Sequence, residues 1–114
     1  MCYSSRGGVP ICFPSFGPWS LGPQHGFART SKWEVSSTKD MSDQDDMAVT
    51  LTLTETTAWD QKFELAYTVT LKEFSLALSL NVKNKNVETP FEFTTALHTY
   101  FKYGFFTFCL LLST

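Results

Sequence analysis

The feature that most constrains the fold is an alternation of apolar and polar residues, with a period of two, that begins at Val49. Val49, Leu51 and Leu53 alternate with threonines, and the next run, residues 63–71 (FELAYTVTL), places an apolar side chain at every odd position. Successive side chains of an extended strand point to opposite faces of a sheet. The period therefore predicts half-buried β-strands.

Two further runs continue this alternation. A tight turn at Lys72-Glu73 is predicted to lead into a third strand over residues 74–82, which has apolar side chains at its even positions. A fourth strand is predicted over residues 91–101. One of its faces carries Phe91, Phe93, Thr95, Leu97 and Phe101, and the other carries Glu92, Thr94, Ala96 and His98. Strands that follow one another through short turns favour an antiparallel meander, so the predicted class is all-β.

The first third of the chain lacks this alternation. Residues 6–24 (RGGVPICFPSFGPWSLGPQ) are interrupted by glycine and proline, which predicts an ordered, aromatic-rich loop with one short strand at about residues 9–13. A second short strand is predicted at residues 33–35. Residues 38–46 (TKDMSDQDD) are predicted to form a solvated acidic loop.

Length and charge narrow the classes of function. A chain of 114 residues has room for one core, and its 43% hydrophobic content predicts a folded domain. The formal net charge of −2 gives no electrostatic reason to expect nucleic acid or an anionic membrane as a partner. An anionic ligand would therefore have to be held by individual cationic side chains.

The cysteines and the apolar segments bear on the cellular compartment. Cys2, Cys12 and Cys109 form neither an even disulfide set nor a CxxC pair, which favours a reducing cytosol. The start MCYSSRGG lacks the basic and apolar regions of a secretory signal. The apolar run 103–112 is much shorter than the roughly 20 residues that cross a bilayer. We expect a cytoplasmic protein.

Two histidines are candidates for proton transfer. His98 ends the fourth predicted strand on its smaller, polar face, where an imidazole could reach a ligand on the sheet and exchange a proton near neutral pH. His25 precedes Gly26, which lets a ligand or another backbone approach closely. On periodicity alone a strand-end histidine is more often structural, and His25 could equally be a loop histidine bonded to a carbonyl group.

Arg6 and Arg29 are the cations best suited to an anionic ligand. A guanidinium offers a planar fork to phosphate, and Gly7-Gly8 beside Arg6 leaves backbone N–H groups accessible. The alternative is that each arginine is a solvated surface charge. The sequence contains no GxSxG, GK[ST] or HExxH motif, and no residues have the spacing of metal ligands. We expect no metal site.

Three segments, RGGVPICFPSFG, GPQHGFAR and FTTALHTYF, occur in that order. Together they resemble the glucose-6-phosphate 1-epimerase branch, the hexose-6-phosphate mutarotases, of the aldose 1-epimerase family, over residues 6 to about 101. The resemblance implies a galactose mutarotase-like β-sandwich, or supersandwich. This chain would be an amino-terminal fragment of that fold and would carry the antiparallel meander.

The resemblance also implies roles for individual residues. Arg6, Gln24 and Arg29 match positions that contact the substrate, with the arginines suited to its phosphate, and His25 would lie in the same sugar pocket. His98 in ALHTYF matches the catalytic histidine, the general acid that protonates the ring oxygen. The implied reaction interconverts the α and β anomers of a hexose 6-phosphate, in a monomer and without a cofactor.

The chain also departs from the family pattern. Residues 102–114 (KYGFFTFCLLLST) match nothing in it, so we expect a partial domain over residues 1–101 and a non-family apolar tail over residues 102–114. Met1 stands almost at the RGG motif, although members of the family have strands before it. We expect a truncated gene model or a splice product to account for both departures. The family's catalytic base is a Glu from the carboxy-terminal half, and no Glu here stands in that motif. Glu92 is six residues from His98, about 20 Å along an extended strand, which is too far for the two to act on one sugar ring.

Three hypotheses follow. The first is an epimerase-family protein whose activity is impaired because the catalytic Glu is missing. The second is a catalytically inactive module that still binds a sugar phosphate. The third is an unfolded, nonfunctional splice product.

Overall fold

The computed structural model describes residues 7–41, 46–54, 56–103 and 106–112. The chain divides into two compact units: unit 1 comprises Met1–Thr30 and Glu92–Thr114, and unit 2 comprises Ser31–Phe91. Among the described residues the regular structure consists of β-strands and one short 3₁₀ helix. The predicted all-β class is therefore confirmed.

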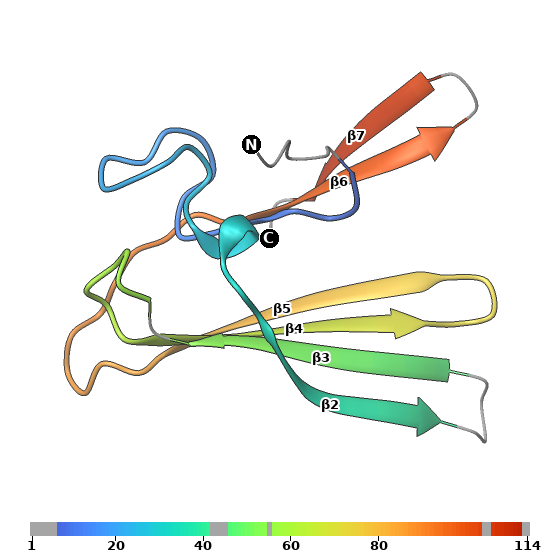
Figure 1. Cartoon of the computed structure of the whole chain (residues 1–114), viewed down its shortest axis with the longest axis horizontal. Helices are drawn as coiled ribbons and strands as arrows, with labels where there is room; N and C mark the ends of the chain where they lie inside the picture. Colours follow the sequence, from blue (N-terminus) through green and yellow to red (C-terminus); the bar gives the residue numbers. More distant parts are fainter. Residues whose placement is uncertain (1–6, 42–45, 55, 104–105, 113–114) are drawn as a thin grey trace. The chain divides into compact units, whose positions relative to one another are not determined.

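Unit 2 is a four-stranded antiparallel meander in the order β2-β3-β4-β5 (Figure 1). The strands are β2, Glu34–Met41; β3, Asp46–Thr54; β4, Phe63–Leu71; and β5, Leu76–Asn84. The alternation in the sequence produces the two faces of the sheet. Leu53, Leu65 and Tyr67 are buried on one face, whereas Thr50 and Thr68, which are paired across β3 and β4, share a hydrogen bond of 2.9 Å.

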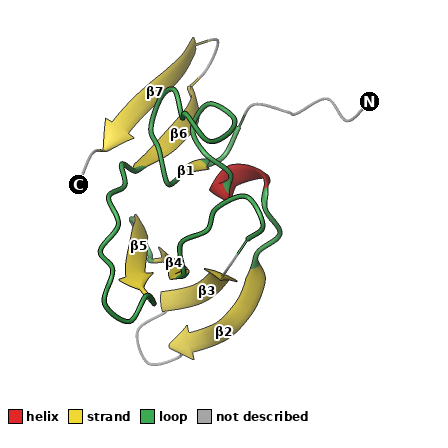
Figure 2. Ribbon diagram, turned by 90° about the vertical axis from the view of Figure 1, so that its left-hand side faces the viewer, coloured by secondary structure: helices red, strands yellow, loops and turns green. Residues whose placement is uncertain are grey.

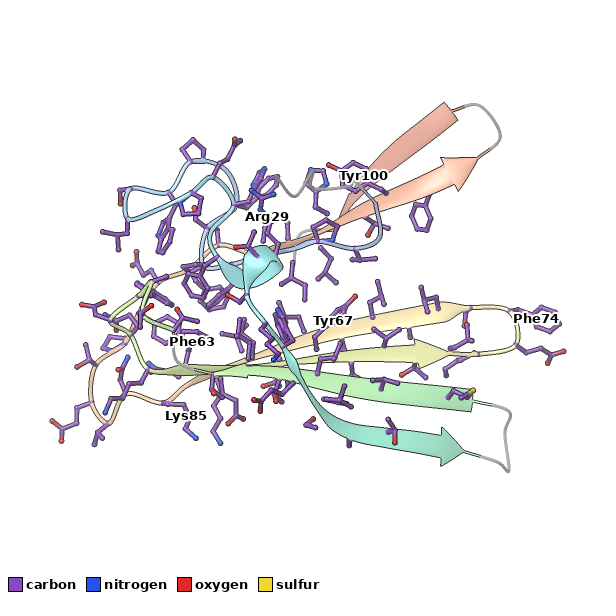
Figure 3. The ribbon with its side chains drawn as sticks, in the orientation of Figure 1. Arg29, Phe63, Tyr67, Phe74, Lys85 and Tyr100 are labelled. Atoms are coloured by element: carbon purple, nitrogen blue, oxygen red, sulfur yellow. The ribbon has the colours of Figure 1, made fainter. Side chains whose placement is uncertain are left out.

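Two details of unit 2 differ from the prediction. β2 continues to Met41, through residues predicted as an acidic loop, because it pairs with β3 from Glu34↔Thr52 to Met41↔Asp46. The turn between β4 and β5 is also longer than predicted. The Lys72 N–H donates to the Ser75 carbonyl oxygen at 2.8 Å, so Phe74 lies in the turn rather than in β5 and is 90% exposed (Figure 3).

Unit 1 contains a three-stranded sheet in the order β1-β6-β7 (Figure 2). Its elements are β1, Ile11–Cys12; the 3₁₀ helix η1, Ala28–Thr30; β6, Ala96–Tyr103; and β7, Phe106–Leu112. β6 pairs antiparallel with both neighbours, and β7 falls within the segment expected to be an apolar tail. The buried side chains of this unit include Ile11, Cys12, Phe13, Phe27, Ala28 and Ala96.

The fourth predicted strand, residues 91–101, is wrong in its start and in its partners. β6 begins at Ala96 and pairs with β1 and β7, not with the meander. The residues before it bond to the amino-terminal loop instead. The Thr94 N–H donates to the Pro14 carbonyl at 2.9 Å, and the Thr95 hydroxyl donates to the Cys12 carbonyl at 2.8 Å.

Candidate functional site

The glycine- and proline-rich loop of unit 1 is held in place by hydrogen bonds to β6 and to the segment that leads into it. The His98 N–H donates to the Pro10 carbonyl and the Tyr100 N–H donates to the Gly8 carbonyl, both at 2.9 Å. Further along the loop, the Phe16 N–H donates to the Thr94 hydroxyl oxygen at 2.7 Å. These bonds hold the loop against the strand that carries His98.

A second part of the loop turns sharply at His25. His25 has a φ of 68° and Gly26 a φ of 71°, two consecutive residues in the left-handed region. A Cβ built on Gly26 would overlap the carbonyl group of Phe13. That carbonyl accepts hydrogen bonds from the N–H groups of Phe27, at 3.0 Å, and Ala28, at 3.2 Å. The close approach of these two backbone segments therefore requires glycine.

Four rings form a continuous cluster at this point. The imidazoles of His25 and His98 meet edge to face, with ring centroids 5.8 Å apart. Phe16 stacks on His25 at 5.2 Å and contacts His98 at 6.4 Å, and Tyr100 stacks on His98 at 5.0 Å. His98 and Tyr100 are two residues apart on β6, so they share a face of the strand. Two aromatic side chains thus flank the pair of histidines.

Arg29, on η1, is attached to the same loop. Its Nη2 donates to the Gln24 carbonyl oxygen at 3.0 Å. Both residues are exposed, and Figure 3 labels Arg29 and Tyr100 on unit 1. A guanidinium carries five N–H donors in a planar fork, so one contact to a carbonyl leaves this cation suited to an exposed anionic group.

The environment of His25 disfavours its charged form. Partial burial lowers the pKa of His25 below its usual 6.5, and the positive charge of Arg29 and the neighbouring His98 lower it further. The Gly17 N–H donates to His25 Nδ1 at 3.0 Å, a bond that a protonated Nδ1 could not accept. The lowered pKa and this hydrogen bond both favour the neutral imidazole at His25.

The structure brings most of the predicted site residues into one loop and strand. His25, His98, Arg29 and the Gln24 backbone lie together, whereas Arg6 is outside the described residues. Sequence reasoning missed Phe16 and Tyr100 as neighbours of the histidines. Tyr100 could have been found from strand parity, since it stands two residues after His98. Phe16 could not, because its contact with His25 depends on how the loop folds back.

Metal ions and membranes would place different demands on the described part of the chain. No group of three or more His, Cys, Asp or Glu side chains lies close enough there to hold a metal ion. Within the same residues, no helix has the length and hydrophobicity needed to cross a membrane. A small pocket on unit 2, lined by Lys32, Glu34, Thr52, Leu53 and Thr54, contains none of the predicted site residues.

Comparison with known proteins gives consistent matches. The family model described as aldose 1-epimerase matches residues 2–106. A provisionally named glucose-6-phosphate 1-epimerase of Escherichia coli strain K12 is 37% identical over 105 residues, covering 87% of this chain. Another protein with the same provisional name, from Cenchrus ciliaris, is 32% identical over 105 residues and covers 84% of this chain.

A solved structure shows the same fold. The crystal structure of a provisionally named mutarotase, YeaD, from Salmonella typhimurium in monoclinic form matches with a TM-score of 0.74 and 32% identity. The match covers 87% of this chain and 33% of that chain. The two curated relatives are covered over 33% and 32% of their own lengths. The chain thus spans about a third of the proteins that it matches.

Proposed function

Because the chain belongs to the aldose 1-epimerase family, we propose that unit 1 binds a hexose 6-phosphate and takes part in interconverting its α and β anomers. The family supports the reaction class, an isomerisation at the anomeric carbon. The provisional names of the relatives from E. coli and C. ciliaris support glucose 6-phosphate as the first substrate to test.

The observation that carries the proposal is the pair of imidazoles with an arginine attached to the same loop. His25 and His98 meet at 5.8 Å, and Arg29 bonds to the carbonyl of Gln24, the residue next to His25. A sugar ring needs polar groups at its hydroxyls and ring oxygen, and a phosphate needs a cation. We assign Arg29, together with Arg6, to the phosphate and Gln24 and His25 to the sugar.

In the proposed reaction His98 is the catalytic acid. A base removes the proton from the anomeric hydroxyl, the bond between C1 and the ring oxygen breaks, and His98 gives its proton to that oxygen. The open-chain aldehyde then rotates about the C1–C2 bond. When the ring closes onto the other face, the attacking hydroxyl returns its proton to His98, the base gives its proton to the former carbonyl oxygen, and the other anomer forms. The cycle consumes no oxidant and no cofactor.

We infer that the 114-residue chain by itself performs this reaction poorly. The only carboxylate in the sequence of unit 1 is Glu92, which is exposed and lies four residues before the start of β6. We do not assign it as the base. Removing one member of an acid–base pair typically lowers the rate by a factor of about 10² to 10⁴.

Exchange spectroscopy on the anomers of glucose 6-phosphate, in the presence of the purified chain, tests the catalytic part of the proposal. We expect slow exchange above the buffer rate, abolished in His98→Gln. A rate equal to that of buffer would reject catalysis by this chain. A rate unchanged in His98→Gln would reject His98 as the acid.

The second candidate is a module that binds the sugar phosphate without catalysis, favoured by the single carboxylate of unit 1. Titration with glucose 6-phosphate, followed by tryptophan fluorescence and thermal shift, separates the two candidates. Binding without exchange supports the module. If the chain shows no binding and no exchange, both candidate functions are rejected. A thermal melt without a cooperative transition would support the third hypothesis, a nonfunctional splice product.

We further propose that the protein acts in the cytoplasm, on the grounds of its cysteine content.

A further inference from the structure

His25 and Gly17 are joined by two hydrogen bonds in opposite directions. The Gly17 N–H donates to His25 Nδ1 at 3.0 Å, and the His25 backbone N–H donates to the Gly17 carbonyl at 2.8 Å. An N–H group can donate only to a ring nitrogen that carries no proton. In a neutral imidazole the single proton then resides on Nε2.

Two further contacts hold the loop around these hydrogen bonds. The N–H of Phe16, the residue before Gly17, donates to the Thr94 hydroxyl at 2.7 Å. This bond connects the loop at Gly17 to the segment that enters β6. The Phe16 ring lies nearly parallel to the His25 imidazole, with an interplanar angle of 20°. The ring of His25 is thus fixed by a stacking partner as well as by Gly17.

The positive groups around His25, like the hydrogen bond from Gly17, favour its neutral form. Arg29 and His98 both disfavour an imidazolium at this position. Glu92 is the only carboxylate in the sequence of unit 1 that could favour it. Two histidines that met at 5.8 Å with both rings charged would also repel each other.

We propose that the Gly17 amide holds His25 as the neutral Nε2–H tautomer, so that His25 is a fixed hydrogen-bond donor to the sugar while His98 is the group that transfers the proton. The donor role rests on the proposed function for the identity of the ligand. The tautomer is independent of the proposed function, since it follows from contacts within the protein. The two histidines of the site would then have different and non-exchangeable tasks.

The tautomer is tested by proton–nitrogen NMR of the imidazole rings in the full ¹⁵N-labelled chain near neutral pH. We expect His25 to show an unprotonated Nδ1 and a protonated Nε2, with His98→Gln used to assign the signals. A proton on Nδ1, a rapid average of the two tautomers, or a doubly protonated ring would overturn the proposal.

The donor role is tested by two substitutions, one that replaces the Nε2 donor of the imidazole and one that replaces its Nδ1 acceptor. In His25→Gln the amide nitrogen reaches the region of Nε2 and can still donate to the sugar. In His25→Asn the amide oxygen can accept the Gly17 N–H, but the side chain ends short of Nε2. We expect glucose 6-phosphate to bind to the Gln variant within a few-fold of the parent chain and to the Asn variant roughly five- to tenfold more weakly, the loss of one hydrogen bond.

Equal affinity of the Asn and Gln variants would overturn the donor role. Absence of glucose 6-phosphate binding in the unsubstituted chain would reject the proposed function and with it the donor role. The NMR measurement would still decide the tautomer in that case, so the two failures are distinguishable.

Discussion

At the scale of single residues, the site depends on a few backbone positions that tolerate little change. Gly26 has a φ of 71° and faces the Phe13 carbonyl group so closely that a side chain would overlap it. The same carbonyl receives two backbone hydrogen bonds from Phe27 and Ala28. Gly26 therefore couples the conformation of His25 to the packing of the loop.

Gly26→Ala is expected to destabilise the chain by more than about 2 kcal/mol. A left-handed backbone costs an L-residue about 1–2 kcal/mol, and displacing the Phe13 carbonyl adds to that cost. Gly7→Ala is the matched control, because a Cβ at Gly7 meets nothing within 4 Å and the residue has no positive φ. Chemical denaturation measures both. Equal stabilities of the two variants would contradict the close approach at Gly26.

His25 should make the stability of the fold depend on pH in its own titration range. Its pKa in the folded chain is lowered, whereas in the unfolded chain it is about 6.5. The unfolded chain therefore binds more protons, and the stability that is present above pH of about 6.5 falls as the pH drops through the folded pKa.

Denaturation of the parent chain and of His25→Gln across this range checks the pH dependence. The free energy of unfolding of the parent should decrease more steeply on acidification than that of the variant. A steeper decrease in the variant would mean that His25 stabilises the fold when charged, the opposite of what its surroundings indicate.

At the scale of elements, the side chains on one face of β4 contribute unequally to the stability of the fold. Phe63, Leu65 and Tyr67 on its apolar face are buried, but Leu71 on the same face is 55% exposed. Burial of the leucine side chain, rather than strand propensity, decides what each leucine contributes to stability.

Leu65→Ala should lower the free energy of unfolding by about 2–5 kcal/mol, because Leu65 is fully buried and its truncation leaves a cavity. Leu71→Ala is the control on the same face of the same strand. It should cost less than about 1 kcal/mol. Comparable losses in urea denaturation would show that the two positions are packed alike, contrary to the structure.

At the scale of the whole molecule, the apolar face of unit 2 is covered unevenly. Met47, Leu71 and Leu76 are in register across β3, β4 and β5 and are 58%, 55% and 53% exposed. Phe74, at the tip of the adjoining hairpin (Figure 3), is more exposed still. β5 also ends the sheet, with β4 as its one neighbour among the described strands. An exposed apolar row beside a sheet edge favours self-association.

Leu76→Lys should reduce the binding of a hydrophobic dye and the tendency of the chain to self-associate, because it places a charge in this apolar row. Ala77→Lys is the control, since it adds the same charge to the same strand but on the opposite face. Dye fluorescence and sedimentation velocity report the two effects. An equal response to both substitutions would attribute self-association to the strand edge and not to the apolar row.

Much of unit 2 was predictable from local pattern. The period of two in residues 63–71 and 74–82 predicted β4 and β5 and the faces they expose, because side-chain direction in a strand depends only on position. The extension of β2 to Met41 was missed, since ladder hydrogen bonds to β3 outweigh an acidic composition. So was the turn at Phe74, where backbone hydrogen bonding decided the length.

The sequence by itself determined the all-β class, the parity that places His98 on one face of its strand, and the motifs that carry the family. It could not determine that β6 leaves the meander to pair with β1 and β7, or that Phe16, His25, His98 and Tyr100 form one cluster. Period and composition are local properties of a chain. Strand partners and ring contacts depend on hydrogen bonds between segments far apart in sequence, and these exist only once the chain has folded.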